Sequence, residues 1–281
     1  MAISEQQKEK ARKFSTMHRQ PGMFILPNAW DVGSAYVFEK QGFAAVATSS
    51  AGIAYALGCP DSETVSFDDY LWIVERMSRR LNIPLSVDFE RGYGETADEV
   101  KDNARKMLLA GVVGFNIEDG QPDGSLAPLE FQLAKIKALT ELKAELDIDF
   151  VINARSCAYW LNIGNEETKL QTACERGNAF AEAGADCVFV PGAVDENTIR
   201  RLVVGIKAPL NIILNGKFND FAQLRKLGVR RLSIGSSLVR YIFDRIIQQS
   251  NALSSGKIKE LLNTDFSYTK ANAYFLSLIH I

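Results

Sequence analysis

The chain has 281 residues, and its 32 basic and 34 acidic side chains leave a net charge of −2. This balance excludes the strongly basic surface that binds nucleic acid or an anionic membrane. The hydrophobic fraction is 47%, and no apolar run reaches the roughly 18 residues of a membrane span. The amino-terminal segment lacks the apolar core of a signal peptide. The four cysteines form no CxxC pair, so the sequence favours a reducing, cytoplasmic location.

Eight short apolar runs recur along the chain. They are rich in β-branched residues and alternate little between apolar and polar side chains, as expected for parallel strands covered on both faces. The predicted strands are residues 23–26, 43–48, 84–89, 112–117, 149–153, 186–190, 209–214 and 230–234.

An amphipathic helical pattern follows each of these runs. The predicted helices are residues 34–40, 67–81, 96–109, 129–146, 166–183, 196–203, 220–227 and 237–250. Ser66 precedes the second helix as a plausible N-cap, and Thr96 and Glu99 form a capping box at the third. Glycine often closes a helix just before the next strand, where a left-handed backbone is cheap only for glycine.

Eight strand–helix units predict a closed (β/α)8 barrel as a single domain over residues 1–281. The competing fold, a doubly wound open sheet, would normally show a GxGxxG turn after an early strand, and the chain has none. Residues 251–281 remain after the eighth helix and are predicted to form a rather apolar, helical C-terminal extension. Such an extension would cap the barrel or pack on a neighbouring subunit.

Acidic residues concentrate where the third and fourth strands end, at the edge where such barrels build their sites. Asp88 and Glu90 are two residues apart, so both side chains are expected on one side of the strand, and Glu118 leaves the next strand at the same level. Three converging carboxylates repel each other unless a cation sits among them, and they suit Mg²⁺ or Mn²⁺. The alternative is that these acids cap helices or pair with Arg91 and Arg155.

Two further features lie at the same edge. Arg155 ends the fifth strand, where a guanidinium binds a substrate carboxylate or serves as a structural partner for an acid. Ser49, Ser50 and Ala51 form a turn of small residues, and its backbone N–H groups would bind a carboxylate. The alternative is that this turn is an ordinary tight connection between a strand and a helix.

The long segment of residues 52–64 is a candidate lid over the barrel mouth, with Asp61 as its reactive group. Separately, Asn215–Lys217 and Gly235–Ser237 end the seventh and eighth strands, where many barrels bind phosphate. The simpler interpretation of the second segment is a cap for the following helix.

With these residues the chain resembles the isocitrate lyase/phosphoenolpyruvate mutase superfamily over roughly residues 20–245. The stretches that carry the resemblance are LPNAWDVGSA (26–35), TSSAGIAYALGCPD (48–61), VDFERGYG (87–94), FNIEDG (115–120), INARS (152–156), GADCVFVPG (184–192) and GVRRLSIGSSLVR (228–240).

The resemblance implies a role for each candidate residue. Asp88 matches the acid that ligates Mg²⁺ directly, and Glu90 and Glu118 match those that hold it largely through water. Arg155 matches the arginine that contacts the substrate, Asp61 the aspartate of the gating loop, and residues 49–51 the loop that binds the substrate carboxylate. Members of the superfamily usually assemble as dimers of helix-swapped dimers, so the resemblance implies a homo-oligomer, dimeric or tetrameric.

The chain also departs from its relatives. Isocitrate and methylisocitrate lyases carry a KKCGH-type motif after the fourth strand, whereas this chain reads GQPDGSLAPLE there, without the cysteine that acts as the acid. The longer, lysine- and asparagine-bearing loop of the phosphonate enzymes is absent too. Glu90 stands where Asp is common, Arg91 where a small residue is usual, and Cys157 where the superfamily has an acid.

The sequence therefore predicts a Mg²⁺-dependent lyase that cleaves a C–C bond next to the carbonyl of a small 2-oxo or 2-hydroxy acid through an enolate. C–P bond chemistry on a phosphonopyruvate-like substrate is the first alternative. A phosphate-binding barrel enzyme that uses the ends of strands seven and eight is the second, and a non-catalytic carboxylate-binding barrel is the third. The sequence names no individual substrate.

Overall fold

The structure is a computed structural model that describes residues 3–257, 259 and 264–276 of the chain. It divides into two compact units, Met1–Ser237 and Leu238–Ile281, which are called here the barrel unit and the C-terminal unit. Each is described by itself. Parts of the predicted C-terminal extension, residues 258, 260–263 and 277–281, lie outside the described residues.

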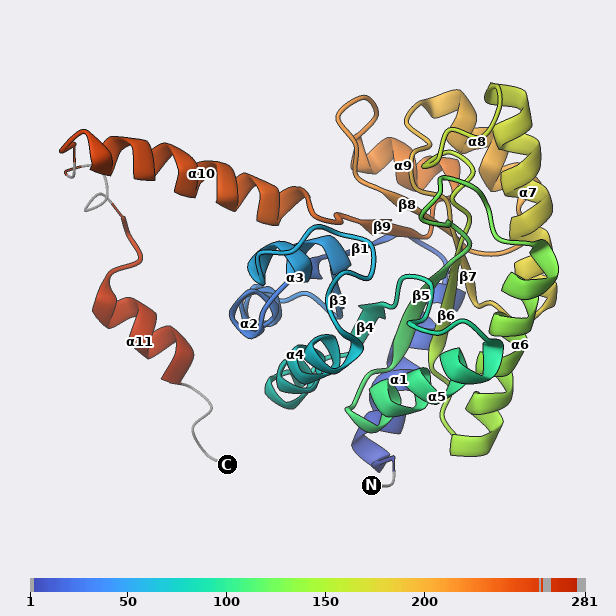
Figure 1. The fold of residues 1–281 in the computed structure, drawn as a ribbon, viewed down its shortest axis with the longest axis horizontal. Helices are drawn as coiled ribbons and strands as arrows, with labels where there is room; N and C mark the ends of the chain where they lie inside the picture. The colour runs from blue at the N-terminus through green and yellow to red at the C-terminus, as the bar shows by residue number, and fades with distance from the viewer. Residues whose placement is uncertain (1–2, 258, 260–263, 277–281) are drawn as a thin grey trace. The chain divides into compact units, whose positions relative to one another are not determined.

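The barrel unit is built on a ring of parallel strands, as the sequence predicts (Figure 1). The strands are β1 (Phe24–Leu26), β2 (Asn28–Ala29), β3 (Val46–Thr48), β4 (Leu85–Asp88), β5 (Gly114–Glu118), β6 (Val151–Arg155), β7 (Cys187–Phe189), β8 (Leu210–Ile213) and β9 (Arg231–Ser233). Only Pro27 separates β1 from β2. Because β1 pairs with β9 and β2 pairs with β3, this interrupted first strand closes the ring into a (β/α)8 barrel.

Asn28 holds the seam at which the first strand is interrupted. This buried carboxamide donates to the Thr48 carbonyl at 2.8 Å, and its oxygen accepts from the backbone N–H groups of Ile234 and Gly235, both at 2.9 Å. One side chain thus ties β2 to both neighbours, β3 and the end of β9. It satisfies backbone groups that the interrupted ladder leaves unpaired.

The helices that connect the strands lie outside the ring (Figure 1). They are α2 (Val32–Lys40), α3 (Ser50–Ala56), α4 (Phe67–Arg80), α5 (Ala97–Leu109), α6 (Leu129–Leu146), α7 (Glu166–Glu182), α8 (Glu196–Gly205) and α9 (Phe221–Leu227). An amino-terminal helix, α1 (Glu5–Arg19), precedes the barrel. Ser66 caps α4, and Thr96 and Glu99 form the predicted capping box of α5.

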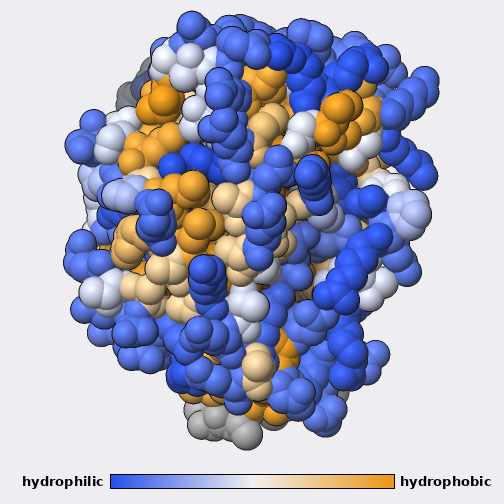
Figure 2. Space-filling model, turned by 90° about the vertical axis from the view of Figure 1, so that its right-hand side faces the viewer, coloured by the Kyte–Doolittle hydropathy of each residue, from blue (hydrophilic) through white to orange (hydrophobic). Residues whose placement is uncertain are grey.

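Side chains of α1 close one end of the barrel. Phe14 lies against Gly114 at the start of β5, where an added Cβ would come within 2.8 Å of its ring. Gln7 donates to the carbonyls of Leu108 and Val112 at the end of α5. Seen from the side of α6, α7 and α8, the surface is largely hydrophilic, with apolar patches between charged side chains (Figure 2). No helix in the described ranges is long and apolar enough to cross a membrane.

The C-terminal unit contains the rest of α10 (Ser237–Ser254), whose first residue ends the barrel unit, and α11 (Tyr268–Leu276). The one buried residue of α10 is Val239 near its start. Six large apolar or aromatic side chains farther along are at least 36% exposed: Tyr241, Ile242, Phe243, Ile246, Ile247 and Leu253. Within the C-terminal unit, α10 therefore exposes several apolar side chains.

Candidate active site

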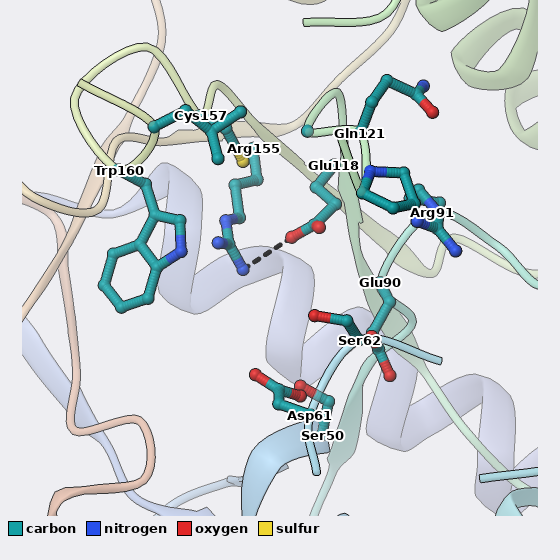
Figure 3. Close-up of a pocket in the computed structure, with 13 residues that line it drawn as sticks. Ser50, Asp61, Ser62, Glu90, Arg91, Glu118, Gln121, Arg155, Cys157 and Trp160 are labelled. Atoms are coloured by element: carbon teal, nitrogen blue, oxygen red, sulfur yellow. Dashed lines mark ion pairs between the residues drawn. The ribbon is translucent and has the colours of Figure 1, made fainter. Parts of the chain in front are cut away.

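A small pocket of about 90 Å³ lies at the ends of neighbouring strands (Figure 3). Its lining includes five of the residues that the sequence singles out: Ser50, Asp61, Glu90, Glu118 and Arg155. They come from α3, from the segment after α3, from the turn after β4, and from the ends of β5 and β6. The strand topology thus brings residues that are up to 105 positions apart in the chain (50 to 155) into one cavity.

Glu118 and Arg155 form an ion pair across the pocket wall. They are register partners on β5 and β6, and Arg155 Nη1 lies 2.6 Å from Glu118 Oε2 (Figure 3). The guanidinium also lies 5.4 Å from the centre of the Trp160 ring, which lines the pocket beside it. Its Nε is buried without a hydrogen-bond partner. The arginine is therefore held in place while part of its donor capacity is unused.

Asp88 is the last residue of β4 and is fixed from several sides. Its N–H donates to Thr48 Oγ1 at 2.9 Å, and its carbonyl accepts from the Tyr70 hydroxyl at 2.7 Å. The carboxylate accepts from Ser50 Oγ at 3.1 Å and from Asn116 Nδ2 at 3.4 Å. This network sets the orientation of the carboxylate beside the pocket.

Glu90 lines the pocket because of the backbone turn after β4, which the sequence did not predict. Because β4 ends at Asp88, the alternation of side chains along a strand does not extend to Glu90, and that part of the prediction was wrong. Glu90 has a φ of 51°, in the left-handed region, and its carboxylate accepts from the Glu63 N–H at 2.7 Å and the Tyr93 hydroxyl at 3.1 Å. Burial raises the pKa of Glu90 to about 9, and the charge of Asp88 adds to this shift.

The predicted ligand set is not assembled as three direct ligands. Within the part of the chain that the structure describes, no three His, Cys, Asp or Glu side chains are grouped so that they could hold one ion. Acidic side chains nevertheless gather at the pocket, and burial and mutual repulsion disfavour their ionised forms. Burial raises the pKa of Glu118 to about 7 against the opposing charge of Arg155, and burial and the charge of Asp88 raise the pKa of Asp61. These residues fit a cation held by one carboxylate and by waters, not by three carboxylates.

The predicted lid is shorter than the sequence indicated. Its first part is helix α3, so the irregular segment is residues 57–66. Asp61 in this segment lines the pocket, and its buried Oδ1 has no hydrogen-bond partner. The sequence analysis did not predict α3, because this helix is short and its small residues, which begin with serines, are typical of a loop.

A contact that we call the Glu63 clasp fastens this segment to the turn after β4. Glu63 Oε1 accepts from the backbone N–H groups of Arg91 and Tyr93 at 3.0 and 3.1 Å, and Oε2 accepts from Arg91 Nε at 3.1 Å. The sequence analysis did not name Glu63, and it named Arg91 only as a possible partner of the three candidate ligand acids. Arg91 instead pairs with Glu63 and holds the segment.

We expect Glu63→Gln to release this segment. The amide cannot accept from the Arg91 guanidinium with both of its terminal atoms, so the charged hydrogen bonds are lost while the side-chain volume is kept. Amide hydrogen exchange over residues 57–66 should accelerate by about tenfold. Glu95→Gln on the exposed turn before α5 is the matched control. Equal protection of the segment in both variants would show that the clasp does not hold it.

The three small residues of the predicted carboxylate cradle have different surroundings. Ser49 is the N-cap of α3, and its hydroxyl accepts from the Gly52 N–H at 3.1 Å. Ser50 lines the pocket and donates to Asp88, and Ala51 is buried behind it. At the other candidate site, Asn215 Oδ1 accepts from the N–H groups of Lys217 and Phe218, so this carboxamide serves the local turn.

A (β/α)8 barrel with acids and an arginine gathered at the carboxyl ends of its strands has the architecture of a barrel enzyme. The chain belongs to the phosphoenolpyruvate phosphomutase family, whose sequence description matches residues 14–254. It is accordingly a member of the isocitrate lyase/phosphoenolpyruvate mutase superfamily and an enzyme of its lyase type.

Relatives of known sequence agree with this placement. An uncharacterized protein of Mycobacterium tuberculosis H37Rv is 33% identical over 79% of this chain and 81% of its own length. The 2-methylisocitrate lyase of Escherichia coli K12 is 29% identical over 63% of this chain and 60% of its own. The oxaloacetate decarboxylase of Pseudomonas fluorescens SBW25 is 26% identical over 80% and 78%. The superfamily thus acts on small carboxylates.

Solved structures show the same fold. A structure from Burkholderia cenocepacia J2315 with the general name lyase/mutase has a TM-score of 0.91 and 28% identity, covering 98% of this chain and 99% of its own. A phosphonopyruvate hydrolase bound to oxalate and Mg²⁺ has a TM-score of 0.83 and 23% identity, with 94% of each chain covered. At that identity the second match supports the fold alone.

Proposed function

We propose that the chain is a Mg²⁺-dependent lyase that cleaves a C–C bond next to the carbonyl of a small 2-oxo or 2-hydroxy acid. The observation that carries this proposal is the Glu118–Arg155 pair, which faces Asp61 and Ser50 in one small pocket beside Asp88. A pocket of this size and charge suits a small anion together with a cation.

Asp88 would bind the cation directly, and Glu118 and Glu90 would hold it through waters. Bound there, Mg²⁺ would supply positive charge to stabilise an enolate. When the bond beside the carbonyl breaks, its electron pair moves into that enolate. Arg155 lines the pocket, binds the substrate carboxylate with guanidinium N–H groups that Glu118 does not engage, and offsets the developing negative charge. Asp61 takes the hydroxyl proton of a 2-hydroxy acid as the bond breaks and returns a proton to the enolate carbon. The backbone N–H groups of Ser50 and Ala51 bind the substrate carboxylate together with Arg155.

The turn after β5 favours C–C over C–P chemistry. Gly120 pairs with Leu126 in an antiparallel bridge, and the Gln121 N–H donates to the Ser125 carbonyl at 2.9 Å, so the turn is tight. Its sequence, GQPDGSLAPLE, has no lysine, asparagine, histidine or cysteine. Among the described residues, this turn contributes Gly120, Gln121 and Pro122 to the pocket lining.

A panel of oxaloacetate, substituted malates, isocitrates and phosphonopyruvate, assayed with Mg²⁺ for release of a 2-oxo acid, tests the proposal. We expect turnover of at least one C–C substrate, its loss in EDTA and its recovery on adding Mg²⁺. Turnover of phosphonopyruvate alone would favour the C–P alternative. Oxalate binding without turnover of any compound would favour a carboxylate-binding barrel, and metal-independent turnover would overturn the proposal.

We also propose that the chain is a cytoplasmic homo-oligomer, a dimer or tetramer, without nucleic-acid or membrane partners. The exposed apolar side chains of α10 support association, and the four cysteines, which are all unpaired, suit a reducing compartment.

The double substitution Ile246→Glu/Ile247→Glu places charge on the exposed apolar side chains of α10 and should lower the molar mass measured by light scattering to that of the monomer. Arg245→Glu, which also adds an acid to α10 but replaces no apolar side chain, is the control. A wild-type monomer would contradict the expectation.

A further inference from the structure

The interior of the barrel below the pocket holds a fully buried arginine. Arg231 on β9 is 0% exposed, and no acidic side chain within the described ranges lies within ion-pair distance of it. Burial lowers the pKa of Arg231 to about 10, so the guanidinium stays charged at neutral pH. A buried charge without a contacting counter-charge is costly, and it calls for an explanation beyond filling space.

The Arg231 side chain reaches across the barrel interior. Its Nε donates to Ser233 Oγ on the same strand at 3.3 Å, and its Nη2 donates to Asn116 Oδ1 at 3.2 Å. Asn116 belongs to β5, and three strands lie between β5 and β9 in the ring. The arginine therefore links two distant parts of the barrel wall and ends on a residue that contacts the candidate active site.

Asn116 accepts a second hydrogen bond, which fixes the orientation of its carboxamide. Asn153 Nδ2 donates to Asn116 Oδ1 at 2.7 Å, so the Asn116 oxygen has two donors, Asn153 and Arg231. A rotated carboxamide would turn its own NH₂ group toward both donors. The two donors thus direct Asn116 Nδ2 toward Asp88 Oδ1, at 3.4 Å, while Ser50 donates to Asp88 Oδ2.

We infer that Arg231 is a positioning residue for the cation site: by fixing the Asn116 carboxamide, it orients Asp88 for the divalent ion. The inference rests on the proposed function, because it assigns Asp88 as the direct ligand. It accounts for a polar side chain in a place where barrels usually pack bulky aliphatic residues. Asp88, Asn116 and Arg231 then form one chain of contacts from the pocket down into the barrel.

A Mn²⁺ binding measurement in the presence of oxalate tests this role. Binding is measured as the loss of the free Mn²⁺ signal in electron paramagnetic resonance. Arg231→Met removes the charge and the donors, and Arg231→Lys keeps the charge but loses the two-armed contact to Ser233 and Asn116. We expect each variant to weaken Mn²⁺ binding by about tenfold. Ser86→Ala is the matched control, since Ser86 is equally buried on β4 and its hydroxyl has no hydrogen-bond partner. It should stay within about twofold of the wild type.

Urea unfolding separates this role from a structural one. Ser233 keeps its contact with Asn211, and Asn116 keeps its contact with Asn153, so the unfolding midpoint of Arg231→Met should not fall. A lower midpoint with unchanged Mn²⁺ affinity would overturn the inference and leave Arg231 structural. Wild-type affinity in Arg231→Lys alone would also overturn it, because charge would then suffice without the contact to Asn116. A wild-type chain that binds no Mn²⁺ with oxalate would overturn the proposed function, and this inference with it.

Discussion

Asp88→Asn should lower turnover by about 10³-fold, the largest loss that we expect from any isosteric change in this chain. The substitution keeps the shape of the side chain and removes the negative charge that would bind the cation. Asp88 ends β4 with its backbone held by Thr48 and Tyr70, so the local fold does not depend on the carboxylate. Mg²⁺-dependent oxalate binding, measured by calorimetry, should be lost together with activity.

Two comparisons make this result specific to Asp88. Asp98→Asn changes an exposed acid in the first turn of α5 and should leave turnover and Mg²⁺ binding unchanged. The unfolding midpoint of Asp88→Asn should stay level or rise, because the change removes one of the charges that raise the pKa of Glu90. If Asp88→Asn still bound Mg²⁺ with wild-type affinity, the direct ligand would have to be another acid of the pocket.

The order of strands and helices was predictable because each is indicated by neighbouring residues in the sequence. Short β-branched runs and capped helices indicate a (β/α)8 barrel, and residues 129–146 form a helix with the predicted bounds. The first strand is interrupted at Pro27, because proline has no N–H to donate to the hydrogen-bond ladder. This interruption changes the number of strand segments from eight to nine and leaves the fold unchanged.

The site was predictable only where position along a strand fixes a side chain. Glu118 and Arg155 end adjacent strands, and the parallel register makes them partners. Glu90 instead depends on a left-handed backbone beyond β4, and the Glu63 clasp depends on how a loop folds back over the pocket. No periodic pattern encodes either feature, because both arise from contacts between segments 27 or 28 residues apart.

The polar interior escaped the sequence analysis for a different reason. Asn116 lies within an apolar run, and Arg231 follows Arg230 at the start of the last predicted strand, where the sequence gives no sign that a basic side chain is buried. Their importance follows only from the contacts across the ring, where Arg231 from β9 meets Asn116 from β5. A single sequence contains both residues but does not state that they meet.

Arg155→Lys separates a substrate-binding role of Arg155 from a purely structural one. Lysine keeps a positive charge beside Glu118 but cannot offer the planar pair of donors that binds a carboxylate. We expect kcat/KM to fall by about 10²–10³-fold while Mg²⁺ binding and the unfolding midpoint change little. Arg155→Met is less informative, since it leaves Glu118 buried beside other acids without its partner, at a cost of about 3–5 kcal/mol.

The same substitution decides between the two interpretations of the Glu118–Arg155 pair. If Arg155 only neutralises Glu118, lysine should serve nearly as well, and Arg155→Lys should retain most of the wild-type kcat/KM. If Arg155 binds the substrate with the donors that Glu118 leaves unused, the loss should appear in oxalate affinity as well as in turnover. Arg176→Lys provides the control, because Arg176 forms a comparable buried pair with Asp119 at 2.6 Å but does not line the pocket. Equal losses in both variants would assign Arg155 to the barrel scaffold, because a catalytic arginine must be more sensitive to this change than a structural one.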